Sequence, residues 1–129
     1  MGAESDRQRW DRKYAVGEGP AHFRPKRFLA EHRPLLAGLL LAGPLLAGGR
    51  ALDVACGFGG NALYLAALGY RVDAVDVSGV ALEQAAAEAA RRGLSINLIQ
   101  ADLARWRLAP EAYDLVLVFF YPVSYTHLT

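Results

Sequence analysis

The chain has 129 residues, of which 53% are apolar and 21% are charged, and its formal net charge at pH 7 is +1. This length suits one domain with a buried core, and the composition excludes an intrinsically disordered chain. The balanced charge gives no general case for a nucleic-acid partner. The single cysteine, Cys56, excludes an intrachain disulfide framework, and without a signal-peptide pattern we expect a reducing, cytoplasmic location.

Residues 1–49 are expected to form a helical segment followed by a linker. The pattern over residues 5–14 is weakly helical. Acids and bases are mixed over the first 33 residues, Asp11 among them, and predict a solvated amphipathic face, with direct binding of an anionic group as the alternative. A second helix is expected over residues 25–41, where Pro34 would kink or split it. The most apolar run of this segment is shorter than the roughly 20 residues of a membrane-spanning helix, so no membrane partner is expected.

From residue 50 onward, strands and helices alternate. Four short apolar runs are typical of strands: 51–55, 71–75, 96–100 and 113–120. Helices are expected between the first three of them, over residues 61–68 and 80–92, and a glycine follows each helix. This alternation predicts the α/β class, with an open sheet of parallel strands joined by right-handed crossovers and flanked by helices. We expect residues 50–123 to form this domain.

The segment 51–63 is the most informative part of the chain. An apolar strand that contains one acid, Asp53, leads through a turn with Gly57 and Gly59 into a helix. Glycines at these positions let the backbone turn sharply and approach a ligand, and the N–H groups at the start of the helix then face that ligand. By itself, such a turn is often only a tight connection.

Two further acids, Asp76 and Asp102, follow the next two strands. Ligands of open parallel sheets bind beyond the carboxyl ends of the strands, so the three acids should border one site. Asp76 follows Gly59 at nearly the spacing at which an acid binds ribose hydroxyls, and Asp102 could accept a hydrogen bond from an adenine amine. Taken singly, Asp76 could be only a helix cap beside Ser78, and Asp102 a loop residue that bonds its own backbone.

Two classes of ligand compete for this pattern. Gly57, Gly59 and Ala62 formally match the dinucleotide fingerprint G-x-G-x-x-A, which would bind NAD. Asp53, however, lies inside the strand before Gly57, where a carboxylate repels a pyrophosphate but suits an ammonium or sulfonium group. The pattern therefore favours S-adenosylmethionine over NAD, with a non-catalytic NAD-binding or adenosine-ligand module as the alternative.

Residues 50–121 resemble the first half of a class I S-adenosylmethionine-dependent methyltransferase. The resemblance rests on "LDVACGFGGNALYLAALGYRVDAVDVS" and "LIQADLARWRL…YDLVLVFFY", which are similar to the nucleotide-binding motifs of that superfamily in the right order. The run Asn61-x-Leu63-x-Leu65-Ala66 and the N-terminal "WDRKYAVGEGP" are most similar to small-molecule methyltransferases of the tellurite-resistance and thiol-methylating type. The resemblance implies a Rossmann-like fold and S-adenosylmethionine as the donor of a methyl group to a small-molecule acceptor.

The resemblance also implies which residues contact the cofactor. Asp53 would orient the methionine amino group, and Ala55, Gly57 and Gly59 would offer backbone contacts to the methionine portion. Asp76 would hold the ribose. The adenine would lie against Val77, Asp102 and Leu103. No metal ligand is implied, and the sequence does not single out a catalytic residue.

Aromatic residues complete the implied site. Phe119 and Tyr121 would border the methyl group and the acceptor. Trp10 and Tyr14 would close over the cofactor as a lid, or else only pack an N-terminal helix. The family often has an arginine where this chain has Gly60, so a contact from that side chain is not expected here. A thiol or another soft acceptor would need little help from a general base.

The family fold has seven strands, and only four are found in this chain. We therefore expect a fragment of a methyltransferase that is truncated after the fourth strand. Residues 124–129 do not continue the family pattern and are expected to be a non-native tail. The fourth strand would then be an exposed apolar edge, which predicts self-association of the fragment.

Overall fold

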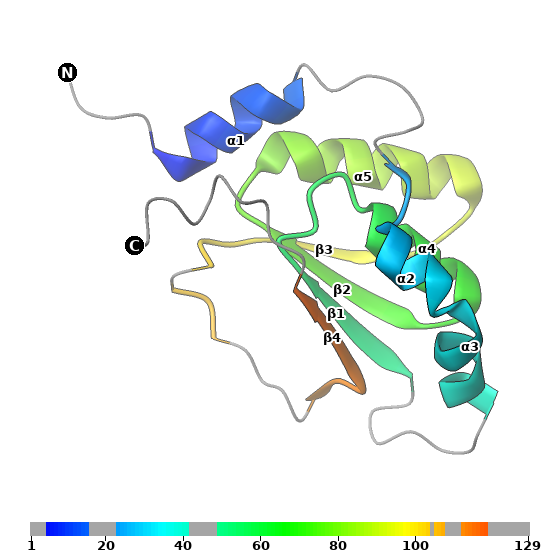
Figure 1. Ribbon diagram of the computed structural model, residues 1–129. Coiled ribbons are helices and arrows are strands. Elements are labelled where there is room, and N and C mark those ends of the chain that lie inside the picture. Colours follow the sequence, from blue (N-terminus) through cyan, green and yellow to red (C-terminus); the bar gives the residue numbers. More distant parts are fainter. Residues whose placement is uncertain (1–4, 16–22, 42–48, 104, 108–111, 119–129) are drawn as a thin grey trace.

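The structure is a computed structural model that describes residues 5–15, 23–41, 49–103, 105–107 and 112–118 (Figure 1). Its helices are α1 (Asp6–Ala15), α2 (Arg27–Glu31), α3 (Arg33–Leu41), α4 (Gly60–Leu68) and α5 (Gly79–Arg92). Its strands are β1 (Arg50–Val54), β2 (Arg71–Asp76), β3 (Asn97–Gln100) and β4 (Leu115–Val118). None of the described helices has both the length and the apolar character that crossing a membrane requires.

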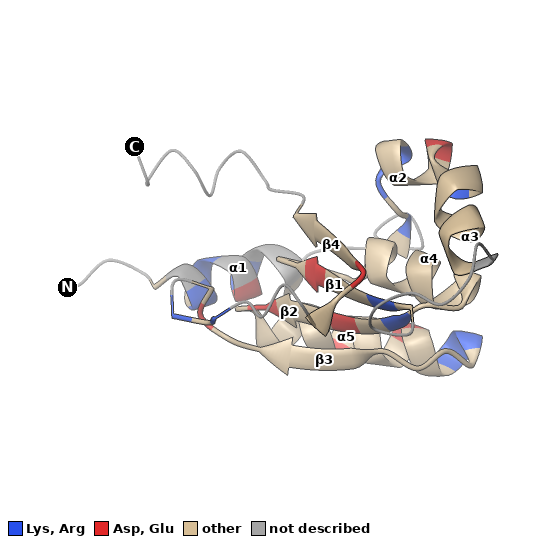
Figure 2. Ribbon diagram, turned by 90° about the horizontal axis from the view of Figure 1, so that it is seen from below, with Lys and Arg blue, Asp and Glu red and all other residues tan. Residues whose placement is uncertain are grey.

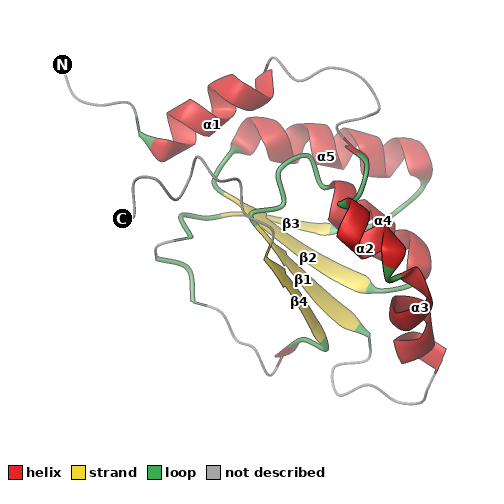
Figure 3. Cartoon of the chain, in the orientation of Figure 1, coloured by secondary structure: helices red, strands yellow, loops and turns green. Residues whose placement is uncertain are grey.

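The four strands form one parallel sheet in the order β3-β2-β1-β4. Helix α4 connects β1 to β2 and contacts both strands, and α5 connects β2 to β3 and contacts both. Since the two crossovers run in the same direction away from β1, α4 and α5 lie on the same face of the sheet (Figure 3). The chain then returns to place β4 on the other side of β1. This arrangement confirms the predicted α/β class with an open parallel sheet.

The core between the sheet and the helices consists mainly of small and branched apolar side chains. Ala51 in β1, and Ala62 and Leu65 in α4, are fully buried in one cluster. Tyr70 joins this cluster, and its hydroxyl donates a hydrogen bond of 2.9 Å to the backbone oxygen of Leu36 in α3. The bond attaches α3 to the start of β2, so helices and strands are held as one layered unit.

The predicted helix over residues 25–41 is two helices. It breaks at His32, whose backbone N–H donates to the Leu29 oxygen at 3.1 Å and ends α2. Pro34 is the second residue of α3, in the first turn, where a missing N–H costs no helical hydrogen bond. The break therefore precedes Pro34, which lies in the first turn of the next helix instead of kinking the first.

Strand β4 forms one edge of the described sheet, and Val118 at its end is 42% exposed. Residues 119–129 hold the end of the predicted fourth strand and the expected tail, and they lie outside the described residues. Self-association through this edge stays a prediction.

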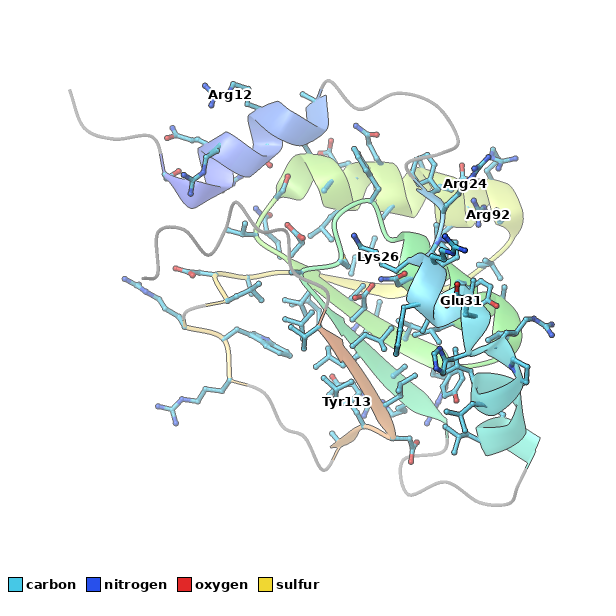
Figure 4. The ribbon with its side chains drawn as sticks, viewed as in Figure 1. Arg12, Arg24, Lys26, Glu31, Arg92 and Tyr113 are labelled. Carbon is cyan, nitrogen blue, oxygen red and sulfur yellow. The ribbon has the colours of Figure 1, made fainter. Side chains whose placement is uncertain are left out.

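A polar cluster joins three strands near their amino ends. Asp73 in β2 accepts hydrogen bonds from the Arg50 guanidinium (2.8 Å), the Tyr113 hydroxyl (2.6 Å) and the Asn97 amide (3.1 Å). Because side chains alternate along a strand, Asp73 points to the face opposite its buried neighbour Ala74. Tyr113 marks this cluster in Figure 4, at the end of the sheet away from α1. The cluster ties the strands together at a distance from their carboxyl ends.

Candidate functional site

Three acids lie at the carboxyl ends of neighbouring strands. Asp53 is the fourth residue of β1, Asp76 ends β2, and Asp102 follows β3 after Ala101. The Ala101 N–H donates to the Asp76 backbone oxygen at 3.0 Å, so the exits of β2 and β3 are side by side. The carboxylate of Asp76 is near enough to raise the pKa of Asp53. The fold thus places the three predicted acids along one edge of the sheet.

The turn between β1 and α4 contains three residues with positive φ. The values are 59° at Ala55, 57° at Gly57 and 83° at Gly59, and Ala55 is the one non-glycine among the described residues with such a value. Left-handed backbone favours glycine because a Cβ crowds the following carbonyl. Gly59 is also the N-cap of α4, and its oxygen accepts the Leu63 N–H at 2.8 Å. The turn therefore relies on its two glycines and carries strain at Ala55.

This strain gives a first testable prediction. Ala55→Gly should raise the free energy of unfolding by about 0.5 kcal/mol, because relief of the left-handed strain exceeds the extra entropy that glycine gives the unfolded chain. Urea denaturation measures the change. Ala67→Gly, the same substitution at an exposed position inside α4, should instead lower stability by about 1 kcal/mol. A loss of stability in both variants would contradict the assigned strain.

Asp53 is the least satisfied group of the site. Its side chain is 1% exposed, and one carboxylate oxygen accepts the backbone N–H of Ala62 in the first turn of α4. The other oxygen, Oδ2, accepts no hydrogen bond from the described residues. Burial, with a smaller contribution from the charge of Asp76, raises the pKa of Asp53 to about 7. A cation or a hydrogen-bond donor placed at Oδ2 would remove this penalty.

Asp76 joins the glycine-rich turn to the segment after β2. Its Oδ2 accepts the Gly57 N–H at 2.8 Å and its Oδ1 accepts the Ser78 N–H at 2.9 Å, with the residue 5% exposed. Burial raises the pKa of Asp76, although these N–H groups act in the opposite sense. Each carboxylate oxygen has a second lone pair that could accept a further donor. Asp76 could therefore accept the Ser78 N–H before α5 and contact a ribose at the same time.

The remaining predicted site residues are placed as follows. Val77 and Leu103 are half-buried, and the side chain of Asp102 is 59% exposed, with its Oδ2 lying 3.9 Å from the Arg105 Nε. The Asp102 backbone oxygen accepts the N–H groups of Arg105 and Trp106 at 2.9 Å each. The side chains of Trp10 and Tyr14, and all of Phe119 and Tyr121, lie outside what the structure describes. Their contacts stay predictions.

The segment 23–26 lies against the start of α4, a contact that the sequence did not predict. The Lys26 N–H donates to the Asn61 Oδ1 at 2.6 Å, and the ring of Phe23 meets that of Phe58 edge to face at 5.8 Å. A Cβ added to Gly60 would lie 2.2 Å from the Arg24 oxygen. Figure 4 labels Arg24 and Lys26 on this segment, where it enters α2 beside α4. The close approach explains why the position holds glycine, and Gly60 is the signal that sequence reasoning could have used.

Comparison with known proteins gives a family match and several similar structures. A family model described as "Methyltransferase domain" matches residues 51–128. A protein described for the conversion of a disulfide bond into a thioacetal group during echinomycin biosynthesis is 31% identical, with a TM-score of 0.60, over 74% of this chain and 38% of its own. The protein PH0226 from Pyrococcus horikoshii OT3 is 24% identical, with a TM-score of 0.56, over 81% and 49%.

A third similar structure is magnesium protoporphyrin IX methyltransferase from Synechocystis PCC 6803 with bound SAH. It is 25% identical, with a TM-score of 0.54, over 84% of this chain and 50% of its own. The chain thus spans half or less of the length of each of these three proteins. The likeness confirms the predicted Rossmann-like fold.

Proposed function

The chain belongs to the methyltransferase domain family, and we propose that it binds S-adenosylmethionine at the carboxyl edge of its sheet for methyl transfer to a small-molecule acceptor. The observation that carries this proposal is the buried Asp53, whose Oδ2 has no donor among the described residues. A methionine amino group, directly or through water, would supply the missing donor and the compensating charge.

The same residue argues against NAD. A dinucleotide places its pyrophosphate at the N-terminus of the helix after the first strand, where free N–H groups receive it. Here the Ala62 N–H is already bonded to Asp53, and that carboxylate would repel a phosphate group. The segment 23–26 also lies against this helix end. A non-catalytic adenosine-ligand or NAD-binding module is therefore the second candidate.

Other residues of the edge have roles that agree with this ligand. In this proposal the turn offers backbone contacts from Ala55, Gly57 and Gly59 to the methionine portion, and Asp76 accepts hydrogen bonds from the ribose. Val77, Asp102 and Leu103 frame the adenine. Phe119, Trp10 and Tyr14 are proposed to border the methyl group or to cover the cofactor. Residues 50–123 form the cofactor-binding unit in this proposal.

The proposed acceptor is a thiol or another soft nucleophile, as in tellurite-resistance and thiol-methylating enzymes. Methyl transfer is an in-line displacement at a carbon activated by its sulfonium, so alignment of the acceptor is the main task of the protein. Of the three histidines, His32 lies in the described part of the chain, between α2 and α3. Its Nδ1 is 2.8 Å from the backbone oxygen of Phe28. A similar protein is itself described for chemistry at a disulfide, which also favours a sulfur acceptor.

Calorimetry with three ligands tests the proposed cofactor. We expect the chain to bind S-adenosylmethionine and S-adenosylhomocysteine and to bind NAD weakly or not at all. If the chain binds NAD but neither of the two sulfur ligands, the NAD-binding module replaces the methyltransferase as the favoured function. Methyl transfer to a panel of thiols, selenite and tellurite then separates an enzyme from a binding module.

Asp76→Ala tests the ribose contact. Loss of a charged hydrogen-bond acceptor should weaken S-adenosylhomocysteine binding by about 1.5–3 kcal/mol, measured by calorimetry on samples that circular dichroism shows to be folded. Asp73→Ala is the matched control, because it removes an acid from the same strand but from the polar cluster on the opposite face. Asp73→Ala should lower stability without changing affinity, and equal affinity losses in both variants would remove Asp76 from the ribose.

A further inference from the structure

Helix α1 is attached to the start of α5 by one carboxylate. Asp11 Oδ1 accepts the backbone N–H of Val80 at 3.2 Å and also the hydroxyl hydrogen of Ser78. The other oxygen of Asp11 lies 3.6 Å from the Arg7 Nε on the same helix. Figure 1 shows α1 lying beside that end of α5, and Figure 2 colours the basic and acidic residues of α1. Asp11 is thus half-buried in a contact between helices and departs from the solvated face expected from the sequence, whereas Arg7, Gln8 and Arg12 are exposed.

The contact completes the cap of α5. Ser78 is the N-cap of this helix, and its hydroxyl oxygen accepts the Ala81 N–H at 3.1 Å. The Val80 N–H, which would otherwise lack a helical partner, is taken by Asp11. A carboxylate at a helix N-terminus is favoured by the helix dipole. The hydrogen bond from Ser78 is the main cause that lowers the pKa of Asp11, and the bond from Val80 acts in the same direction. Burial opposes both.

The cap continues directly into the proposed cofactor site. The backbone N–H of Ser78 donates to Asp76 Oδ1 at 2.9 Å, and Asp76 Oδ2 accepts the Gly57 N–H at 2.8 Å. One chain of hydrogen bonds therefore runs from Asp11 in α1 through Ser78 and Asp76 to the glycine-rich turn. Val77, which is proposed to contact the adenine, lies between Asp76 and Ser78 in the amino-acid sequence.

We infer that Asp11 is a positioning residue, which fixes α1 beside the Asp76 end of the site and couples the docking of α1 to occupancy by an S-adenosyl ligand. This inference rests on the proposed function. Coupling between two equilibria is reciprocal. A bound ligand that orders Asp76 and Ser78 should therefore strengthen the docking of α1, and loss of Asp11 should weaken the ligand.

The test measures S-adenosylhomocysteine affinity by calorimetry and amide hydrogen exchange of α1 with and without the ligand. Asp11→Ala should weaken binding about tenfold, the lower end of what one charged hydrogen bond contributes, and should abolish the ligand-induced protection of α1. Asp11→Asn keeps an acceptor for Val80 and Ser78, so it should weaken binding only about threefold. Glu31→Ala is the control, because Glu31 pairs with Arg27 on the exposed face of α2 (Figure 4). It should leave affinity and protection unchanged.

Each outcome decides the inference. Unchanged affinity in Asp11→Ala together with lower stability would overturn it and leave Asp11 as a helix cap only. Exchange of α1 that the ligand does not slow in the wild-type chain would overturn it as well. A wild-type chain that binds neither sulfur ligand would overturn the proposed function, and the inference with it. If Asp11→Ala does not fold, Asp11→Asn decides by the same two measurements, with unchanged values overturning the coupling.

Discussion

Replacing Asp53 by asparagine is expected to stabilise the ligand-free chain by about 2–4 kcal/mol at pH 8 and by about 1 kcal/mol at pH 5. Burial raises the pKa of Asp53 to about 7 from 3.8, and each pKa unit corresponds to about 1.4 kcal/mol. At pH 8 the folded wild-type chain holds an ionised carboxylate with an unpartnered oxygen. An amide is neutral at every pH, so the variant avoids most of this cost.

The direction of the pH dependence follows from proton binding. Below about pH 4, Asp53 is protonated in both the folded and the unfolded chain and contributes no slope. Between about pH 4 and pH 7, only the unfolded chain is ionised, so the free energy of unfolding falls as the pH rises. Above pH 7 both states are ionised and the loss is constant. Asp76, whose pKa burial also raises, should leave a smaller slope of the same sign in the variant.

Urea denaturation of both proteins at pH 5, 6.5 and 8 measures this effect. Asp53→Asn should also weaken S-adenosylhomocysteine binding, since an amide cannot supply the charge that pairs with an ammonium group. Gain of stability and loss of affinity in one variant would identify a residue kept for binding at the expense of folding. Equal stability of the two proteins at pH 8 would sink the assignment of a buried, ionised Asp53.

The edge of the sheet could be predicted because its signals are local. Asp53, Asp76 and Asp102 follow apolar runs of strand length, and parallel strands joined by crossovers bring their carboxyl ends to one edge. Gly57 and Gly59 were informative for a similar reason, since their left-handed backbone is a property of the turn itself. Such local patterns therefore predict which residues lie at the carboxyl edge of the sheet.

The partners of these residues could not be predicted from local patterns. The bond between Asp76 and Gly57 depends on the packing of two loops, and that between Asp11 and Ser78 joins residues 67 positions apart. In sequence, Asp11 looks like any acid of a charged helix, because nothing near it indicates that α5 needs a second capping group. The helix breaks at His32 and not at Pro34, where the sequence predicted it, because proline is also tolerated in the first turn of a helix.

Gly60→Ala is expected to lower the free energy of unfolding by about 3 kcal/mol, although alanine is the better helix former. The added Cβ would lie 2.2 Å from the Arg24 oxygen and 2.7 Å from its carbonyl carbon, so backbone must move. The movement would strain the Lys26–Asn61 hydrogen bond and the packing of Phe23 on Phe58. Urea denaturation measures the loss. Gly38→Ala in α3 is the matched control, because its Cβ meets nothing within 4 Å, and it should gain about 0.5–1 kcal/mol.

A second substitution shows whether the segment 23–26 is strained in place or detached. Asn61→Ala alone should cost about 1 kcal/mol, the usual net value of one hydrogen bond. If Gly60→Ala displaces the segment, the Lys26–Asn61 bond is already lost, and Asn61→Ala should add little in that background. Additive losses would mean that the segment stays bound and the helix start yields instead. Equal gains in Gly60→Ala and Gly38→Ala would contradict the close approach, and with it the reason for glycine at this position.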